Sequence, residues 1–284
     1  MEKDPPVKST VSMGIGCISR TDYNDNNAFY QHHHDVLEIL CVTSGKIIVT
    51  VDKTEYLLKK GDVVIVNPFK IHFGKWVEQS DAEYYCYTCN LKSLFGFHTS
   101  VLEKCQKQLL EGTLQFDVYH NSQSESAKFI LDILTKTHTE FGKKTPSSEC
   151  LCVGYTYMLC AYLFDNCCKE SDAPDTSRDV EFIKQVSVYM NDNYTNNIST
   201  SHIAKHFYMT TSRFCSVFQK NFGLSFLNYL CYFRIIRASE MYFNKGMSLY
   251  DIAYKVGFSD YNYFSKMFKK YMGVTPSKYY GKTK

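Results

Sequence analysis

Three histidines and one glutamate in the N-terminal part of the chain have types and spacings that suit a binding site. His32, His34 and Glu38 form an H-x-H-x-x-x-E pattern within the stretch YQHHHDVLE, and His72 follows later. Imidazole nitrogens and carboxylate oxygens are ligands that divalent metals accept. The same groups also form hydrogen bonds with organic molecules. These four residues are therefore a candidate site for a metal ion or for a small molecule.

The segments around these residues read as short strands. Between about residues 28 and 92, β-branched runs such as Lys46–Val51 are separated by turn residues, among them Thr43-Ser44-Gly45 and Asn67-Pro68. Short β-branched segments separated by turns predict an antiparallel β-barrel or sandwich. A β-rich domain is thus the expected frame of the four residues.

Apolar residues recur with helical spacing from about residue 99 to 169. A first segment ends near Gly142, and residues 148–168 form a second, apolar-rich segment. Helices this apolar need a surface to pack against. Two partners remain open: the β-rich domain, and the same helices of a second subunit, which would make the protein a homodimer.

The composition is that of a globular protein. The chain has 284 residues, of which 44% are hydrophobic and 21% are charged, and this length suits two domains. No run approaches about eighteen apolar residues and the N-terminus reads MEKDPPVKST, so we expect a cytoplasmic protein without a membrane segment or signal peptide. Cys86 and Cys89, two of twelve cysteines, form a C-x-x-C pair. In a strand these two side chains point to opposite faces, which argues against a shared metal.

Charge is distributed unevenly along the chain. Residues 171–284 carry 15 Lys and Arg against 8 Asp and Glu, whereas residues 1–170 carry 17 against 21. A basic domain suits a polyanion such as nucleic acid. The stretch at 170–178, ESDAPDTSR, is polar and contains a proline, which predicts a linker between the two regions.

The last hundred residues contain an internal repeat. The segments Ile198–Tyr229 and Met247–Tyr279 share Ile-Ala at an offset of 49. Further pairs match at an offset of 50, namely Phe214/Phe264, Phe218/Phe268, Lys220/Lys270, Gly223/Gly273 and Tyr229/Tyr279. Matches at nearly constant register indicate two copies of one structural unit, with one residue inserted in the turn of the second copy.

Each copy is predicted to fold as helix, short turn, helix. Thr210 or Thr211 can cap the second helix of the first copy, and Ser259 or Asp260 can do so in the second copy. The paired phenylalanines lie four residues apart, on one helical face, and we expect them in the core. A helix from about Ser225 to Asn244 joins the copies, so that two helices can enter successive major grooves about 34 Å apart.

The second copy also resembles a known family signature. It reads I-A-x-x-x-G-F-S-D-x-x-Y-F-S-K-x-F-K-K-x-x-G-x-T-P-x-x-Y from Ile252 to Tyr279, which is similar to the signature of the AraC/XylS family of bacterial transcription regulators. Arg234 and Ala238 have the R-x-x-x-A spacing of that family. The resemblance covers residues 180–284 and departs from the family at Tyr280, where Arg is usual and would contact the DNA backbone. It implies a regulator, usually an activator, with promoter DNA and RNA polymerase as partners.

The resemblance assigns DNA contacts residue by residue. Base contacts fall on the starts of the two recognition helices, at Thr211, Ser212, Cys215, Ser216, Tyr261, Asn262, Ser265 and Lys266. Phosphate contacts, which position without specifying, fall on Arg213, Lys220, Lys269 and Lys270. Asn262 can pair with adenine and Lys266 with guanine, whereas the first helix offers mostly short side chains. We therefore expect the second motif to carry more of the sequence specificity.

The N-terminal motif resembles the two motifs of cupins, because Gly45, Gly61-Asp62 and Pro68 accompany the histidines. The resemblance implies that His32, His34, Glu38 and His72 converge inside a barrel, where they bind a divalent metal or an organic effector. Lys70 replaces the glycine expected in cupin enzymes, and no asparagine follows His72. The expected effector contacts are Tyr30, His32, His34, Glu38, His72, Phe73, Trp76 and Tyr85.

Together these features predict a two-domain α+β regulator whose DNA binding responds to a small molecule. The expected parts are a cupin-like antiparallel barrel at 1–98, a helical dimerisation region at 99–169, a linker at 170–178 and an all-α DNA-binding domain with two helix-turn-helix motifs at 179–284. Sugar sensors of the family make a carbohydrate the first effector to test. We expect no catalytic residue and no required cofactor, with a divalent metal as the one cofactor to examine. Two alternatives remain open: a metal-dependent cupin enzyme fused to a DNA-binding module, and a ligand-independent DNA-binding protein.

Overall fold

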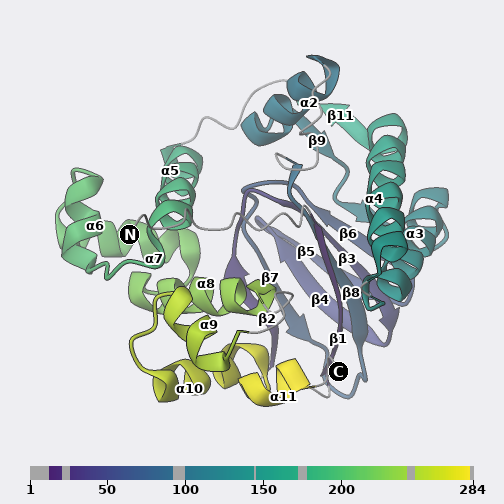
Figure 1. Ribbon diagram of the computed structural model, residues 1–284. Helices are drawn as coiled ribbons and strands as arrows, with labels where there is room; N and C mark the ends of the chain where they lie inside the picture. The colour runs from purple at the N-terminus through teal and green to yellow at the C-terminus, as the bar shows by residue number, and fades with distance from the viewer. Residues whose placement is uncertain are drawn as a thin grey trace.

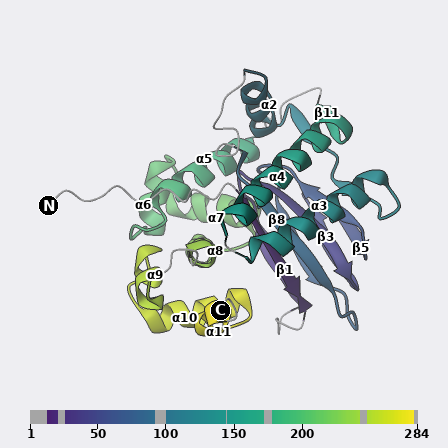
Figure 2. The same ribbon diagram turned by 45° about the vertical axis from the view of Figure 1, so that its right-hand side comes forward.

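A β-rich N-terminal domain and an all-helical C-terminal domain make up the fold, as the sequence predicts (Figure 1). The computed structural model describes residues 13–20, 26–91, 100–143, 145–171, 178–241 and 247–281. In the N-terminal domain, α3 (Glu125–Phe141) and α4 (Pro146–Asn166) cover the outer face of one sheet (Figure 2). The helices of the C-terminal domain lie against the region of β2 and β7 (Figure 1).

Two antiparallel sheets form the β-rich domain. The first has the spatial order β1 (Met13–Ser19), β8 (Glu83–Cys89), β3 (Leu37–Ser44), β6 (Val63–Val66) and β10 (Tyr119–His120). The second has the order β2 (Asn27–His32), β7 (His72–Trp76), β4 (Lys46–Val51) and β5 (Thr54–Lys59). Each sheet keeps its own edges, so the predicted antiparallel fold takes the form of a sandwich and does not close into a continuous barrel.

Strand β3 shows why the central strands are apolar on both faces. Leu37, Ile39 and Cys41 belong to the hydrophobic core between the first sheet and the helices outside it. Leu40 and Val42 belong to the core between the two sheets. Successive side chains of a strand point to opposite faces, and both faces of this sheet are covered. The continuous apolar run of the sequence is therefore the mark of a central strand.

The middle of the chain packs on the outer face of the first sheet. It contains α2 (Ser100–Glu111), β9 (Leu114–Phe116), β10, α3 (Glu125–Phe141), α4 (Pro146–Asn166) and β11 (Cys168–Glu170). Ile130, Ile133 and Leu134 of α3 lie in one core with the side chains of that sheet. Of the two packing partners that the sequence left open for these helices, the β-rich domain is therefore one. Helix α3 ends at its cap Gly142, as the helical spacing predicts.

Some short strands are absent from the sequence-based description. Strands β9 and β11 pair with each other inside the segment that reads as helical, and each has only three residues. Strand β1 lies before the predicted strand region and pairs with β8, far along the chain. Strands of three residues leave too few positions for a local period to appear. For β1, the partner strand lies too far along the chain for a local pattern to reveal the pairing.

Seven helices make up the DNA-binding domain. They are α5 (Arg178–Asn193), α6 (Thr200–His206), α7 (Thr211–Phe222), α8 (Phe226–Met241), α9 (Leu249–Lys255), α10 (Tyr261–Met272) and α11 (Pro276–Gly281), counted over the described residues. The two helix-turn-helix motifs are α6–α7 and α9–α10, and α8 connects them, which confirms the predicted repeat. The expected end of α8 at Asn244 lies outside the described residues.

Matching caps begin the two recognition helices. The side chain of Thr210 accepts a hydrogen bond from the Arg213 amide at the start of α7. Asp260 does the same for the Tyr263 amide at the start of α10. These contacts satisfy amide donors that have no partner inside the helix. Both caps are among the alternatives that the sequence offers.

Candidate DNA interface and histidine cluster

The start of α7 presents polar side chains above a buried aromatic anchor. Phe214 and Phe218 are fully buried and contact each other. Because these residues take up the inner face of the helix, the opposite face points to solvent. The exposed residues of that face include Thr211, Ser212, Cys215 and Ser216. The phenylalanines therefore position the helix, as expected, and all four predicted base-contacting residues of α7 are accessible.

Helix α10 has the same construction with longer polar side chains. Phe264 and Phe268 are fully buried, while Asn262 and Lys266 are exposed. Ser265 is half-buried. Tyr261 is half-buried as well and stacks on Tyr250 of α9, with 4.2 Å between ring centroids. Asn262 and Lys266 are thus the two side chains of this group with most freedom to reach a base edge.

Three of the four predicted phosphate contacts have no ion-pair partner within the described part of the chain. Arg213, Lys269 and Lys270 are exposed. Lys220 differs, because its Nζ lies 2.6 Å from Asp179 Oδ2 of α5. The hydrogen bond from Lys220 lowers the pKa of Asp179. This pair ties the C-terminal end of α7 to α5, so Lys220 has a structural partner that the sequence did not reveal.

Exposed tyrosines border the second motif, and the sequence analysis did not single them out. Tyr250 and Tyr254 of α9 are 66% and 79% exposed, and Tyr263 of α10 is 52% exposed. A hollow of about 210 Å³ lies between these helices, lined in part by Tyr250, Tyr254 and Tyr261. The spacing of four residues between Tyr250 and Tyr254 on a polar helix face was the available signal.

Two residues of the family signature are structural. Tyr280, at the position where the family usually has Arg, is 2% exposed and its hydroxyl donates to the carbonyl of Ala238. Tyr280 therefore packs in the core instead of contacting the DNA backbone. Arg234 donates to the carbonyls of Tyr194 and Asn196, which ties the segment after α5 to α8.

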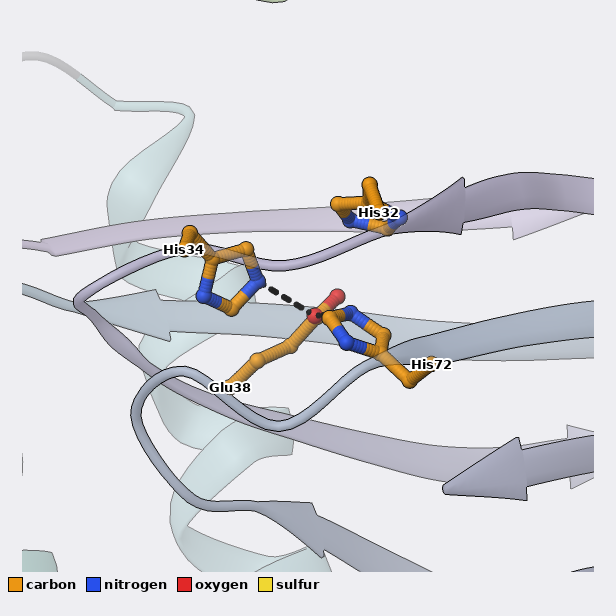
Figure 3. Close-up of side chains that lie close together, drawn as sticks. All are labelled: His32, His34, Glu38 and His72. Atoms are coloured by element: carbon orange, nitrogen blue, oxygen red, sulfur yellow. Dashed lines mark hydrogen bonds and ion pairs between the residues drawn. The ribbon is translucent and has the colours of Figure 1, made fainter. Parts of the chain in front are cut away.

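In the β-rich domain, the four candidate ligand residues meet in one place (Figure 3). His32 lies at the end of β2, His34 in the turn that follows, Glu38 on β3 and His72 at the start of β7. One ligand atom from each residue lies within 4.8 Å of the others. The side chains of Glu38 and His72 are 6% and 0% exposed, whereas that of His34 is 21% exposed. We call these four residues the histidine cluster.

Each imidazole of the histidine cluster contacts a backbone carbonyl oxygen through its Nδ1 atom. His32 Nδ1 lies 2.7 Å from the carbonyl of Tyr30, His34 Nδ1 lies 3.1 Å from that of Val36, and His72 Nδ1 lies 2.9 Å from that of Lys70. A carbonyl can only accept, so each Nδ1 carries a proton. In the neutral imidazole, Nε2 then presents a lone pair. Metal-binding histidines typically have this arrangement.

The Nε2 atoms of two histidines converge on one carboxylate oxygen. His34 Nε2 and His72 Nε2 lie 2.9 Å and 2.7 Å from Glu38 Oε2. A lone pair and a carboxylate repel each other, so each contact needs a proton or another cation between its atoms. This donor set therefore fits a divalent transition metal, whose ligands would be the three Nε2 atoms and the carboxylate.

The charges within the histidine cluster support the same description. Burial opposes ionisation of Glu38, but the charge of His72 and the hydrogen bonds from both histidines hold the pKa of Glu38 well below its usual value. Burial also opposes the charge on His34, yet the hydrogen bond and the charge of Glu38 raise the pKa of His34. Burial, together with the charge of His72, lowers the pKa of His32 well below its usual value. These shifts favour a neutral His32 beside an ionised Glu38 carboxylate.

Cys86 is an additional neighbour that the sequence analysis treated differently. Its thiol donates to Glu38 Oε1 over 2.9 Å. Burial, followed by the charge of Glu38, raises the pKa of the Cys86 thiol well above its usual value, so it remains a thiol. Cys89 lies on the other face of β8, in the core under the helices. The expected opposite orientation of this C-x-x-C pair is therefore confirmed.

The other predicted effector residues lie in different places. Trp76 faces the space between the sheets, 5.9 Å from the ring of Tyr84, with Arg20 at 6.0 Å from its own ring. Tyr85 packs on the outer face of the first sheet against His138 of α3, because strand alternation turns it away from the interior. The missed interior residues are therefore Arg20 and Tyr84.

Phe73 and Tyr30 are also directed away from the interior. Phe73 neighbours His72 on β7 and points to the opposite face, where Lys75 Nζ lies 5.8 Å from its ring. Tyr30 contacts the DNA-binding domain, at 5.6 Å from the ring of Tyr271. Of the eight predicted effector contacts, only the histidine cluster and Trp76 thus line the space between the sheets.

The comparisons with known proteins agree with both domains. Residues 17–128 match the family model of an AraC-like ligand binding domain, and residues 203–282 match that of a helix-turn-helix domain. Among the described residues, no helix is long and apolar enough to cross a membrane.

Relatives and solved structures extend this likeness along the chain. The uncharacterised HTH-type transcriptional regulator YdiP of Escherichia coli (strain K12) is 25% identical over 267 residues, which cover 92% of this chain and 85% of YdiP. The lactose operon transcription activator of Staphylococcus xylosus is 33% identical over 99 residues, 35% of this chain and 36% of the activator. In fold, the chain is similar to ToxT of Vibrio cholerae strain SCE256 with a bound unsaturated fatty acid, with a TM-score of 0.55 and 14% identity over 99% of this chain and 97% of ToxT.

These matches describe transcription regulators and not enzymes. The ligand-binding model matches the β-rich domain and the helix-turn-helix model matches the repeated motifs. A relative that spans nearly the whole chain is named as a transcriptional regulator. The chain therefore belongs to the AraC family of DNA-binding transcription regulators with a ligand-binding domain.

Proposed function

We propose that this regulator reads its operator through both recognition helices and mainly through α10. The supporting observation is the difference between the exposed side chains of the two helices. Asn262 and Lys266 of α10 are long enough for paired hydrogen bonds to a base edge, whereas Thr211, Ser212, Cys215 and Ser216 of α7 are short. Arg213, Lys269 and Lys270 supply phosphate contacts. A fluorescence-anisotropy titration of Asn262→Ala against cognate and random DNA tests this assignment.

We propose further that a divalent transition metal bound by the histidine cluster is the controlling ligand. One observation carries this proposal: three imidazoles donate from Nδ1 to carbonyls, and two of them direct Nε2 at one oxygen of Glu38. A site with this donor set must hold protons or a cation to be stable. Metal binding would replace the protons with one ion that all four side chains share.

Cobalt(II) provides a direct test of the metal proposal, because its visible absorption reports its ligands. We expect purified, metal-free protein to bind one Co²⁺ with a new absorption spectrum, and bound metal to raise the melting temperature. His34→Ala should lose most of this affinity, whereas His202→Ala, at an exposed position of α6, should retain it. Wild-type protein that shows neither a spectrum nor a thermal shift with Co²⁺, Zn²⁺, Mn²⁺ or Ni²⁺ would exclude a metal as the ligand.

A carbohydrate is the second candidate ligand, and a separate observation favours an organic molecule. Arg20 Nη1 is buried and has no hydrogen-bond partner within the described part of the chain. It lies near Trp76, whose indole ring is able to stack on a sugar. A panel of sugars and organic acids, screened by thermal shift and by Trp76 fluorescence, addresses this site. A thermal-shift response that both Arg20→Ala and Trp76→Phe abolish would support it, and a panel without any thermal shift would count against it.

We also propose that α4 forms a homodimer. Its outward side exposes Leu151, Val153, Tyr157 and Met158 by 38–52%, and apolar residues grouped on one surface often mark a protein interface. Met158→Glu should convert a dimer into a monomer in light scattering after size exclusion. Lys128→Glu, on exposed surface of α3, is the matched control. A monomeric wild-type protein would refute the dimer.

The proposed output is activation through RNA polymerase. The support is the likeness of the C-terminal part to a lactose operon transcription activator. In vitro transcription from a bound promoter should rise when the protein is added. A fall in transcript at saturating protein would identify a repressor instead.

A further inference from the structure

Two segments of the β-rich domain carry both the histidine cluster and the contacts with the DNA-binding domain. The first runs from Tyr30 to His34 and contains two cluster histidines, and the second runs from Phe69 to His72 and contains the third. The Phe69 amide donates to the His34 carbonyl over 2.7 Å, which joins the two segments. We call them the coupling segments.

His33 contacts three helices of the DNA-binding domain. Its ring lies 4.3 Å from that of Phe222 at the end of α7, and its Nδ1 lies 3.3 Å from Ser187 Oγ of α5. Its carbonyl accepts a hydrogen bond from the Tyr229 hydroxyl of α8. The side chain is 3% exposed and is not part of the histidine cluster. One residue of the β-rich domain thus contacts three helices of the other domain.

The residues just before His33 extend the contact to both helix-turn-helix motifs. Gln31 Nε2 donates to the Asn221 carbonyl near the end of α7, and the Tyr30 ring lies 5.6 Å from that of Tyr271 near the end of α10. Both recognition helices are therefore held at their C-terminal ends. Six of the eight predicted base contacts, which lie in the first two turns of these helices, remain exposed.

The second coupling segment enters the core of the first motif. Phe69 and Ile71 pack against the hydrophobic cluster formed by α5, α6, α7 and α8. Lys184 of α5 places its Nζ 5.6 Å from the Phe69 ring. Phe69 has a positive φ of 64°, a conformation that is unfavourable for a residue with a side chain. The loop is therefore held in this form by the contacts on both sides.

The cluster and the interface share hydrogen bonds. The Nδ1 protons of His32 and His72 are donated to the carbonyls of Tyr30 and Lys70, which belong to the coupling segments. The His32 ring also lies 5.6 Å from that of Tyr232 on α8. A change in the orientation of either imidazole therefore moves backbone that contacts the DNA-binding domain.

We propose that occupancy of the histidine cluster by a divalent transition metal favours docking of the DNA-binding domain through the two coupling segments. This inference rests on the metal-binding role proposed above. Histidines fixed at Nε2 by a common cation keep their Nδ1 protons on the Tyr30 and Lys70 carbonyls, which is the form that the docked arrangement requires. Because coupling between two equilibria is reciprocal, docking must strengthen metal binding by the same factor as metal binding strengthens docking.

The interface contains one polar atom that docking leaves unsatisfied. His33 Nε2 is buried there without a hydrogen-bond partner among the described residues. An unsatisfied buried polar atom lowers the free energy that docking gains. Docked and released arrangements of similar free energy are what a ligand needs in order to shift their populations. Since docking holds α7 and α10 together, the shift would reach the DNA-reading surface.

The test compares Co²⁺ affinity in full-length variants that retain all four cluster residues. His33→Ala removes the contact from the β-rich side. Ser187→Ala removes one of its partners from the DNA-binding side, on a helix that contributes no residue to the histidine cluster. His202→Ala is the control, since it removes an imidazole that is exposed on α6. Circular dichroism checks that each variant is folded, and Ser187→Ala decides the question if His33→Ala does not fold.

We expect His33→Ala to bind Co²⁺ about 5- to 150-fold more weakly than wild type, the usual range for coupled sites, with an unchanged absorption spectrum. Ser187→Ala should show a smaller loss of at least about twofold, in line with one hydrogen bond, and His202→Ala should show none. Equal Co²⁺ affinities of folded His33→Ala, Ser187→Ala and wild type would overturn the coupling and leave the metal site standing. A wild-type protein that does not bind Co²⁺ would overturn both.

Discussion

Replacing Glu38 by Gln in metal-free protein measures how strongly the carboxylate holds the histidine cluster together. Glu38 accepts from His34 Nε2 at 2.9 Å, His72 Nε2 at 2.7 Å and the Cys86 thiol at 2.9 Å, and its side chain is 6% exposed. The amide of Gln has one acceptor oxygen and no charge. Removing one partner of a buried ionic pair costs about 3–5 kcal/mol. Since His34 is 21% exposed and keeps some hydration, we expect a loss of about 3 kcal/mol in the free energy of unfolding.

Urea unfolding followed by tryptophan fluorescence is a suitable assay, with a chelator present. Trp76 is the only tryptophan of the chain and is 5% exposed inside the β-rich domain, so its emission reports on that domain. With a urea dependence of about 1–3 kcal/mol per molar, the midpoint should fall by about 1–3 M. Glu55→Gln, on an exposed position of β5, should change stability by less than about 0.5 kcal/mol. A loss below about 1 kcal/mol for Glu38→Gln would refute the assigned role of the carboxylate.

Three further changes test the DNA-binding domain. Asn262→Ala should cost about 1–3 kcal/mol on the cognate site and little on random DNA in fluorescence anisotropy; equal losses on both DNAs would remove it from base readout. Lys269→Ala should weaken both complexes alike and reduce the slope of log affinity against log salt by about 0.9; an unchanged slope would exclude a phosphate contact. Gly257→Ala should lower stability by about 2 kcal/mol in thermal unfolding, because φ is +93° and an added Cβ would lie 2.8 Å from the Thr195 carbonyl oxygen. The contrasting change Gly142→Ala, where φ is −73° and an added Cβ meets nothing within 4 Å, should be neutral or stabilising.

The DNA-binding domain was the part of the fold that the sequence specifies best. Its motifs consist of local helices, and the buried phenylalanines, the caps and the glycines recur at fixed offsets in two copies. Local periodicity and a repeat together identify such elements without knowledge of distant contacts. Tyr280 shows the limit, since only the structure reveals that it packs on α8.

The sequence identifies the four residues of the histidine cluster but not the residues that surround them. The H-x-H-x-x-x-E pattern and His72 identified the four residues that meet. Cys86 and Tyr84 lie on β8, and Arg20 directly follows β1. The pairing of these strands joins distant parts of the chain. Tyr85 was assigned to the interior because aromatic character alone does not tell which face of a strand a residue occupies.

The interface between the domains had no signal in the sequence. His33 and Ser187 are 154 residues apart, and neither belongs to a motif. His33 lies between two cluster histidines, at the position that the H-x-H pattern leaves open, and its side chain contacts the other domain. Contacts of this kind depend on how two finished domains fit together, and one sequence contains no local pattern for that.

Selection of bound sites from random DNA by the full-length protein, followed by sequencing, tests the central claim most directly. We predict two preferred sequence blocks centred about 10–10.5 base pairs apart on one face of the duplex. The block under α10 should be the more strongly specified, and Asn262→Ala should lose preference within that block alone. A single block, or a loss of preference by Asn262→Ala spread equally over both blocks, would contradict the claim that two unequal recognition helices read adjacent grooves.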